Sequence, residues 1–312
     1  MQFPFKLKDN AEFDVVGFGT NAVDFLIQVP HYPEFNSKVE LTDYVQAAGG
    51  EIATSMVGIQ RLGLRSSYVG RFGNDVAGDI GMRSLSKEGV DMTYAEQIDD
   101  ARTQIAFIVI DERSGERTVI WKRDARLSYT ESDVPVDAVR NTKVLHFTPH
   151  DARACIKLAD AARRNGTIVS IDVDNVFEDL EQLLASVDII IASSDFLPKL
   201  FGTIEPRDAL VEMQKRFGAG LVGVTLGESG SLLLCGDEFV LTPGFEVPGG
   251  CKDTTGAGDS FRVGLLYGLI TGQSIEESAR VANAVAALKC RAIGARTGLP
   301  TPDELHGFLK NL

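Results

Sequence analysis

The chain has 312 residues, of which 44% are hydrophobic and 24% charged, and its formal net charge is -13 at pH 7. These values are typical of a globular protein with a substantial core, and the negative charge argues against a general binder of nucleic acid or anionic membranes. The cysteines show no metal-type spacing, no stretch is long and apolar enough to cross a bilayer, and the first residues lack a signal-peptide pattern, so we expect a cytoplasmic protein.

The first apolar run, residues 14–19, predicts a short strand that ends in glycine. In an open α/β sheet, ligands collect at the carboxyl ends of the strands. Asp24, which follows this run, is therefore a candidate to hold a polar ligand. A turn carboxylate in contact with water is the alternative interpretation.

Two segments indicate a small accessory sheet. Residues 25–46 alternate loosely and contain prolines, which is typical of edge strands. Residues 101–123 alternate on both sides of a Ser-Gly turn, which predicts a hairpin. Between them, Gly49 and Gly50 open an amphipathic stretch, residues 51–62, that predicts a helix. The glycines would let a ligand approach the backbone closely.

From residue 143 onward, short apolar strands alternate with amphipathic helices. The predicted strands are 144–147, 168–171, 188–191 and 221–225, and the helices between them are 151–164, 178–185 and 205–217. Such alternation is typical of βαβ units and therefore of a parallel sheet. We expect one domain, with the accessory sheet inserted near its front.

The most distinctive stretch is Asp253–Phe261, which reads DTTGAGDSF and continues into an apolar segment that ends at Ile270. A glycine-rich turn that opens a helix points backbone N–H groups at the positive end of the helix dipole, which suits an anion. Asp259 lies in the first turn of this helix, beside the expected anion. Gly264 and Gly268 share one helical face, where a neighbouring backbone can approach. An ordinary capped turn without a ligand is the alternative.

Several segments together resemble the ribokinase-like (PfkB) carbohydrate kinase family, over about residues 14–300. The string DTTGAGDSF matches the C-terminal signature of that family residue for residue. The other matching segments are 48–63 and 70–78, with the layout of the N-terminal signature, and 224–227 and 278–290, which resemble nucleotide-binding segments.

The resemblance implies an α/β fold of three layers, in which a central, mostly parallel sheet lies between helices. It also implies a single kinase domain over residues 1–312. A small β-sheet lid, formed by the discontinuous segments of about 25–47 and 101–124, would cover the sugar.

The resemblance further implies roles for individual residues. Asp259 would be the general base that accepts a proton from a sugar hydroxyl. The backbone amides of Gly256, Ala257 and Gly258 would form the anion hole for the γ-phosphoryl group of ATP, with Mg²⁺ as cofactor. The remaining roles are sugar binding by Asp24, Gly49, Gly50 and Thr54, nucleotide binding by Thr225, Gly227, Gly230 and Asn283, and a monovalent-cation site, for K⁺, at Asp253 and Thr255.

The sequence departs from the family pattern in two motifs. Glu51 and Thr54 stand at the two asparagine positions of GGNxxN, which implies a different sugar or a different orientation of the sugar. The NxxE motif, which helps to organise Mg²⁺, is absent, and Asp195 is the residue that would take over part of its role.

The predicted function is an ATP-dependent kinase for a small carbohydrate that is fructose-like, ketohexose-like or ribose-like. The alternatives are a nucleoside kinase, a phosphosugar kinase, and a catalytically weak protein that binds a sugar or nucleotide as a sensor. A phosphosugar requires a basic residue near the site, for which the candidates are Arg102, Lys122 and Arg123. The lid would either cover the sugar or pair two chains in a homodimer through Phe107, Val109, Ile120 and Trp121.

Overall fold

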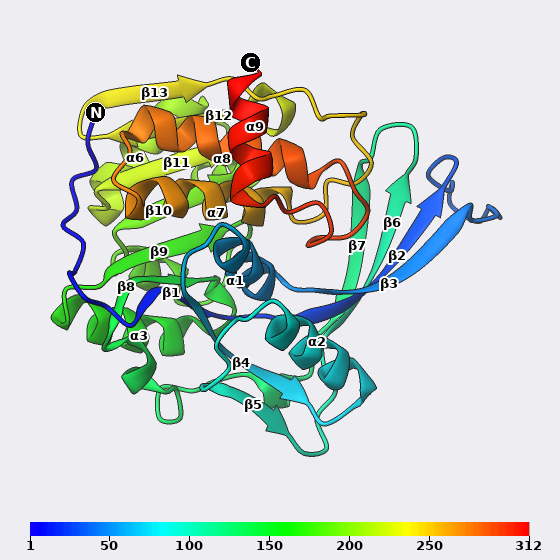
Figure 1. The fold of residues 1–312 in the computed structure, drawn as a ribbon, viewed down its shortest axis with the longest axis horizontal. Helices are drawn as coiled ribbons and strands as arrows, with labels where there is room; N and C mark the ends of the chain where they lie inside the picture. Colours follow the sequence, from blue (N-terminus) through cyan, green and yellow to red (C-terminus); the bar gives the residue numbers. More distant parts are fainter. Residues whose placement is uncertain (312) are drawn as a thin grey trace.

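The structure, a computed structural model, describes residues 1–311 and contains a large and a small β-sheet (Figure 1). Within these residues the large sheet has nine strands, in the order β13-β12-β11-β10-β9-β8-β1-β4-β5. Neighbouring strands pair in parallel, except that β12 runs antiparallel to both β11 and β13. The strands are β1 Phe13–Phe18, β4 Ser66–Gly73, β5 Ala95–Ile98, β8 Thr142–Phe147, β9 Ile168–Val173, β10 Ile189–Ser193, β11 Leu221–Thr225, β12 Ser231–Cys235 and β13 Glu238–Thr242.

Helices cover both faces of the large sheet (Figure 1). One apolar core lies under α1 Glu51–Arg61, α2 Val76–Lys87, α7 Ala257–Ile270, α8 Ile275–Lys289 and α9 Pro302–Lys310. The other lies under α3 Ala152–Arg164, α4 Leu180–Leu184, α5 Phe196–Phe201 and α6 Pro206–Phe217. Short 3₁₀ helices are η1 Ala125–Leu127, η2 Val136–Val139, η3 Pro149–Asp151 and η4 Gly227–Ser229. The three-layer α/β fold predicted from the sequence is confirmed.

The small sheet, which we call the lid, projects from one side of the main body (Figure 1). Its strand order is β3-β2-β6-β7, with β2 Ala22–Val29, β3 Asp43–Gly49, β6 Ile105–Asp111 and β7 Arg117–Lys122. One face, which we call the inner face, carries a small buried cluster of Leu26, Ala106, Ile108 and Ile110. The opposite, outer face carries Phe107 and Ile120, which are 42% and 60% exposed.

Some elements differ from the sequence prediction. The helix expected from Ser278 begins earlier, at Ile275, because the Ser274 hydroxyl caps it by accepting a hydrogen bond from the Glu277 N–H at 3.2 Å. Strand β2 begins at Ala22, so Asp24 lies inside a lid strand and not in a loop. The elements β5, β12, β13, α5 and α9 have no counterpart among the predicted ones.

The glycines of α7 confirm the predicted close approach of a neighbouring backbone. A Cβ atom on Gly264 would lie 2.5 Å from the Ala282 Cα, and one on Gly268 would lie 2.2 Å from the Ser278 Oγ. Both contacts belong to α8. The pair of helices therefore packs with almost no space between the backbones, which fixes the position of the loop that precedes α7.

Candidate active site

The site is built around the amino end of α7. Gly256 precedes the helix with a φ of 78°, in the left-handed region that glycine adopts without strain. A Cβ atom there would also lie 3.0 Å from the Ala295 side chain. The Ala257 N–H donates to the Thr254 carbonyl at 3.1 Å. Of the three amides predicted to bind an anion, the Ala257 amide is therefore already used inside the loop, which leaves Gly256 and Gly258 as the candidate donors.

Asp259, the predicted general base, is 8% exposed in the first turn of α7. Its carboxyl group lies close to that of Asp172, at the carboxyl end of β9, and burial raises the pKa of both groups. Burial raises the pKa of Asp259 above its ordinary value. The negative charge of Glu51 acts in the same direction, whereas the nearby Arg262 lowers the pKa. A carboxylate with a raised pKa is suited to general-base catalysis near neutral pH.

Arg262, one turn after Asp259, is a buried cation that the sequence prediction does not include. Its guanidinium lies 2.5 Å from the Asp172 carboxylate and donates to the Ile191 carbonyl at 2.9 Å. A Cβ atom on Gly258 would lie 2.6 Å from its Nη1. The guanidinium therefore lies directly behind the candidate anion hole. The signal in the sequence is its position as the one charged residue in the apolar run of α7.

Glu51 opens α1 and faces the carboxylates of the site. Burial, followed by the negative charges of Asp174 and Asp172, raises the pKa of Glu51 to about 8, although 35% of its side chain remains exposed. Its carboxyl group accepts a hydrogen bond from the Thr20 hydroxyl at 3.3 Å and lies 3.7 Å from the His150 Nδ1. At neutral pH this group is therefore mostly protonated, and it can donate a hydrogen bond as an asparagine amide would.

Asp24 meets Gly49, the last residue of β3, and Gly50, which follows it, on the inner face of the lid. A Cβ atom on Gly49 would lie 1.9 Å from the Asp24 carboxylate, and Gly50 has a φ of 89°, so both positions require glycine. Asp24 is 4% exposed, and burial raises its pKa to about 6 against the opposing charge of Arg296. The structure therefore brings together three of the four residues predicted to bind sugar.

Arg296, which the sequence prediction also does not include, hydrogen-bonds the turn that contains Gly49. Its guanidinium donates to the Gly49 carbonyl at 2.5 Å, to the Ser84 hydroxyl at 2.9 Å and to the Thr54 hydroxyl at 3.4 Å. Thr54, the fourth predicted sugar ligand, is completely buried. In this structure its hydroxyl therefore holds Arg296, which in turn fixes the glycine turn.

The predicted nucleotide residues gather around the turn between β11 and β12. Thr225 ends β11, and Gly227 and Gly230, with φ values of 60° and 98°, lie at the two ends of the turn η4. The Asn283 amide of α8 is buried and donates to the Ser231 hydroxyl at 3.1 Å. Asn283 thus ties α8 to the strand that follows the turn.

The predicted monovalent-cation site already contains a protein cation. The buried Asp253 carboxylate accepts hydrogen bonds from the Thr255 N–H at 2.8 Å and the Gly294 N–H at 2.7 Å. The Lys289 ammonium donates to the Asp253 carbonyl at 2.7 Å and lies 3.8 Å from its carboxylate. Burial lowers the pKa of Lys289 and Asp253 opposes this shift. Since the charge of Asp253 is already compensated, these residues do not fit K⁺.

Asp195, predicted to help position Mg²⁺, lies close in the sheet to a second exposed carboxylate, Asp174. Asp174 follows the end of β9, and Asp195 lies after β10, just before α5. Because β9 and β10 are parallel neighbours, both side chains lie at the same edge of the sheet. Among residues 1–311, no group of three or more His, Cys, Asp or Glu forms a metal cage.

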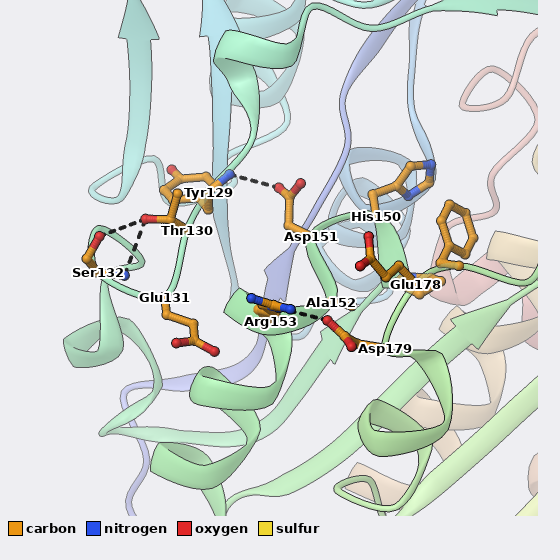
Figure 2. A pocket seen from close by; sticks show the side chains of 12 residues that line it. Tyr129, Thr130, Glu131, Ser132, His150, Asp151, Ala152, Arg153, Glu178 and Asp179 are labelled. Carbon is orange, nitrogen blue, oxygen red and sulfur yellow. Dashed lines mark hydrogen bonds and ion pairs between the residues drawn. The ribbon is translucent and has the colours of Figure 1, made fainter.

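A pocket of about 640 Å³ is lined by residues 129–132, 149–153 and 177–179 (Figure 2). Its wall includes Tyr129, His150 and Phe177, with an ion pair between Arg153 and Asp179 along one side. The His150 ring contacts Phe177 at a centroid distance of 5.1 Å. His150 also lies beside Glu51, so the pocket adjoins the site without containing Asp259.

The family can now be assigned. The pattern that describes the pfkB family of carbohydrate kinases matches residues 14–302. The chain belongs to this family. Among curated relatives it is 29% identical to an ATP-dependent 6-phosphofructokinase of Thermoanaerobacterium thermosaccharolyticum, across 96% of this chain and 95% of that protein. It is 25% identical to a nucleoside kinase of Methanothermobacter thermautotrophicus, across 93% of this chain and 94% of that protein.

The fold of the chain is also similar to solved structures of kinases. A ribokinase of Arabidopsis thaliana complexed with ribose and ATP is 25% identical, with a TM-score of 0.82, and covers 96% of this chain and 99% of its own. An adenosine kinase of Sinorhizobium meliloti is also 25% identical, with a TM-score of 0.81, over 97% of this chain and all (100%) of its own. The chain is therefore a sugar or nucleoside kinase of the pfkB family.

Among the described residues, no helix is long and apolar enough to cross a membrane.

Proposed function

We propose that this pfkB kinase transfers the γ-phosphoryl group of ATP to a hydroxyl of a small, uncharged sugar of the fructose, ketohexose or ribose type. The observation that carries the proposal is the buried Asp259 at the amino end of α7, next to backbone amides and the Arg262 cation. Phosphoryl transfer requires mainly positioning and stabilisation of charge, and this arrangement supplies both.

In the proposed reaction, Asp259 accepts the proton of the attacking sugar hydroxyl. The amides of Gly256 and Gly258, with the charge of Arg262 behind them, stabilise the negative charge on the transferring group. Mg²⁺ bound with ATP would neutralise the phosphates, and Asp174 and Asp195 are the carboxylates that would hold it. Since the proposed donor is ATP, we also propose the cytoplasm as the place of action.

For ATP itself, we propose the turn after β11. Gly227 and Gly230 provide backbone that a nucleotide can approach closely, and Thr225 provides a hydroxyl at the end of the strand. Asn283 would act by fixing this turn, because its amide is bonded to Ser231. Asp24, Gly49 and Gly50 would hold hydroxyl groups of the acceptor, on a turn fixed by Thr54 through Arg296.

The charges around the acceptor side favour an uncharged substrate over a phosphosugar. Arg123 is used in a bidentate ion pair with Asp151, at 3.0 and 2.9 Å. Lys122 and Arg102 are exposed, and Lys122 pairs with Ile105 on the outer face of the lid. The Asp24 carboxylate would repel a second phosphate group, and the neutral Glu51 supplies no positive charge to bind one.

A nucleoside is the second candidate acceptor, because the pocket beside Glu51 has aromatic walls. Trp121 lies on the inner face of the lid, opposite Ala106, and contacts His150 at a centroid distance of 6.1 Å. Together with Phe177 these rings could hold a base attached to the sugar. We expect Phe177→Ala to raise the KM of a nucleoside and to leave that of a free sugar unchanged.

The test is ADP release from Mg·ATP with ketohexoses, aldohexoses, pentoses, sugar phosphates and nucleosides. One acceptor class should give turnover, and Asp259→Asn should reduce kcat by about 10²–10⁴-fold, the usual contribution of a general base. Binding of ATP to this variant, followed by calorimetry, should persist. Asp237→Asn, in an exposed turn, serves as the matched control. Full turnover by Asp259→Asn would contradict the proposal.

We also propose a homodimer through the outer face of the lid. Phe107, Ile120 and Val109 share this face, and Phe107 stacks on Phe25 at a centroid distance of 5.0 Å. Trp121, which we grouped with them from the sequence, lies on the inner face instead. Light scattering should give a dimer mass that Ile120→Asp converts to a monomer mass. A monomer for the unmodified chain would contradict this assignment.

A further inference from the structure

We propose that the Lys289 ammonium is a built-in counter-cation of the catalytic loop, residues 253–258, and replaces the K⁺ that the family resemblance predicts. The inference rests on the proposed function of this loop as the anion hole. Its consequence is a kinase whose activity does not depend on monovalent cations.

The position of Lys289 carries the inference. It is the last residue of α8, and its side chain has no exposed surface. The ammonium donates to the Asp253 carbonyl at 2.7 Å and lies 3.8 Å from the carboxylate of the same residue. A lysine is rarely buried so completely unless its charge is paired. The ammonium therefore hydrogen-bonds a backbone carbonyl of the predicted cation site and lies within ion-pair range of the carboxylate that a bound K⁺ would use.

The hydrogen bonds of the Asp253 carboxylate show which residues the Lys289 ammonium holds in place. Its two carboxylate oxygens accept the N–H groups of Thr255, inside the loop, and of Gly294, outside it. Thr255 is followed directly by Gly256, which opens α7. Lys289 is thus a positioning residue, which fixes the loop through Asp253 and does not itself reach the reacting atoms.

A second cation would have no charge left to pair with. Asp253 contributes one negative charge, which Lys289 already compensates. Arg117, from the lid, adds another cation by donating to the Thr254 hydroxyl at 3.0 Å. This site is buried, and its negative charge is already paired. Binding K⁺ here would therefore cost desolvation free energy that no attraction to an unpaired negative charge offsets.

The first test compares the unmodified kinase in KCl, NaCl and tetramethylammonium chloride at equal ionic strength. We expect the same kcat and the same midpoint of thermal unfolding in all three salts. A selective increase of either value in KCl would overturn the proposal. The unfolding midpoint requires no substrate, so this result stands even if the proposed kinase function fails.

The second test creates a dependence on K⁺ by removing the ammonium. In tetramethylammonium chloride, Lys289→Ala should lower kcat by about 10²-fold, the scale on which anion-hole stabilisation is lost, and lower the unfolding midpoint. KCl should restore much of the lost kcat and of the lost unfolding midpoint, and it should restore more of each than NaCl does. The matched control is Lys252→Ala, which removes an exposed cation from the position directly before Asp253. We expect no salt response from this variant.

A folded Lys289→Ala variant that is indifferent to K⁺ would also overturn the proposal, because the ammonium would then be an ordinary structural ion pair. If Lys289→Ala does not fold in any salt, the neutral Lys289→Met variant takes its place. This variant fills the space that K⁺ would need, so it should show the loss of kcat without rescue by KCl. Unchanged kcat in Lys289→Met would contradict a role for the charge.

Discussion

The two ends of the site compensate charge in different ways. At the donor end, residues 253–262, the cations Lys289 and Arg262 are buried and paired with Asp253 and Asp172. At the acceptor end, residues 49–54 with Asp24 and Arg296, the pKa of Asp24 is raised to about 6 and that of Glu51 to about 8. The donor end therefore presents backbone amides next to two buried cations, with Asp259 as its titrating group, whereas the acceptor end presents carboxyl groups with raised pKa values.

This difference corresponds to two kinds of task. The transferring phosphoryl group has the same charge in every ATP-dependent kinase, so a rigid, buried arrangement is suitable at the donor end. The acceptor varies between the relatives of this chain, whose names include a phosphofructokinase and a nucleoside kinase. A side chain such as Thr54, which contacts Arg296, can change there without disturbing the donor end.

The largest effect is expected from breaking the ion pair at the donor end. Arg262→Met leaves Asp172 buried without its cation, which should reduce the free energy of unfolding by about 3–5 kcal/mol. Loss of the charge behind Gly258 should also lower kcat by about 10²-fold. Urea unfolding and ADP release measure the two effects.

The double variant Arg262→Met/Asp172→Leu separates these effects. Replacing a buried ion pair by apolar groups is often close to neutral for stability, so the double variant should regain most of the unfolding free energy. It should not regain kcat, because the cation behind the anion hole is still missing. Equal stability of the single variant and the unmodified protein would contradict the pairing.

An intermediate effect is expected at Glu51, and it should depend on pH. Because the pKa of Glu51 is raised to about 8, the group is neutral below that pH and becomes negative above it, next to Asp259. The kcat of the unmodified kinase should therefore fall above pH 8. In Glu51→Gln, which stays neutral, this alkaline decrease should be absent, and kcat below pH 7 should be nearly unchanged.

The profile of kcat against pH, measured in buffers of constant ionic strength, tests this expectation. Glu51→Asp is the control that keeps a titrating group. An alkaline decrease that persists in Glu51→Gln would assign the ionisation to a different residue. On the acid side, the rate should fall below neutral pH in both proteins, because the raised pKa of Asp259 leaves the base protonated there.

The smallest effect is expected at Thr54. Thr54→Val removes the hydroxyl that contacts Arg296 at 3.4 Å and keeps the size of the side chain. Loss of one such hydrogen bond should raise the KM of the acceptor by about 2–10-fold through a less fixed Gly49 turn. The KM of ATP should not change, since the donor end is not involved. Thr54→Ser, which keeps the hydroxyl, should behave as the unmodified protein.

The sequence alone was sufficient to predict the fold class, the small lid sheet and the amino end of α7. These features depend on local patterns: alternating strands and helices, a Ser-Gly hairpin turn, and a glycine-rich string of nine residues, Asp253–Phe261, that opens an apolar helix. Each can be interpreted over a short window, because the backbone conformation involved follows from the residues in that window.

The tertiary structure alone decided which charges meet. Arg262 and Asp172, Lys289 and Asp253, and Arg296 and Thr54 are far apart in the chain and come together only when helices pack on the sheet. A charged residue in an apolar run indicates that a partner exists, but the partner is chosen by topology and burial. For this reason the place predicted for K⁺ from the motif contains Lys289, which only the packing of α8 brings there.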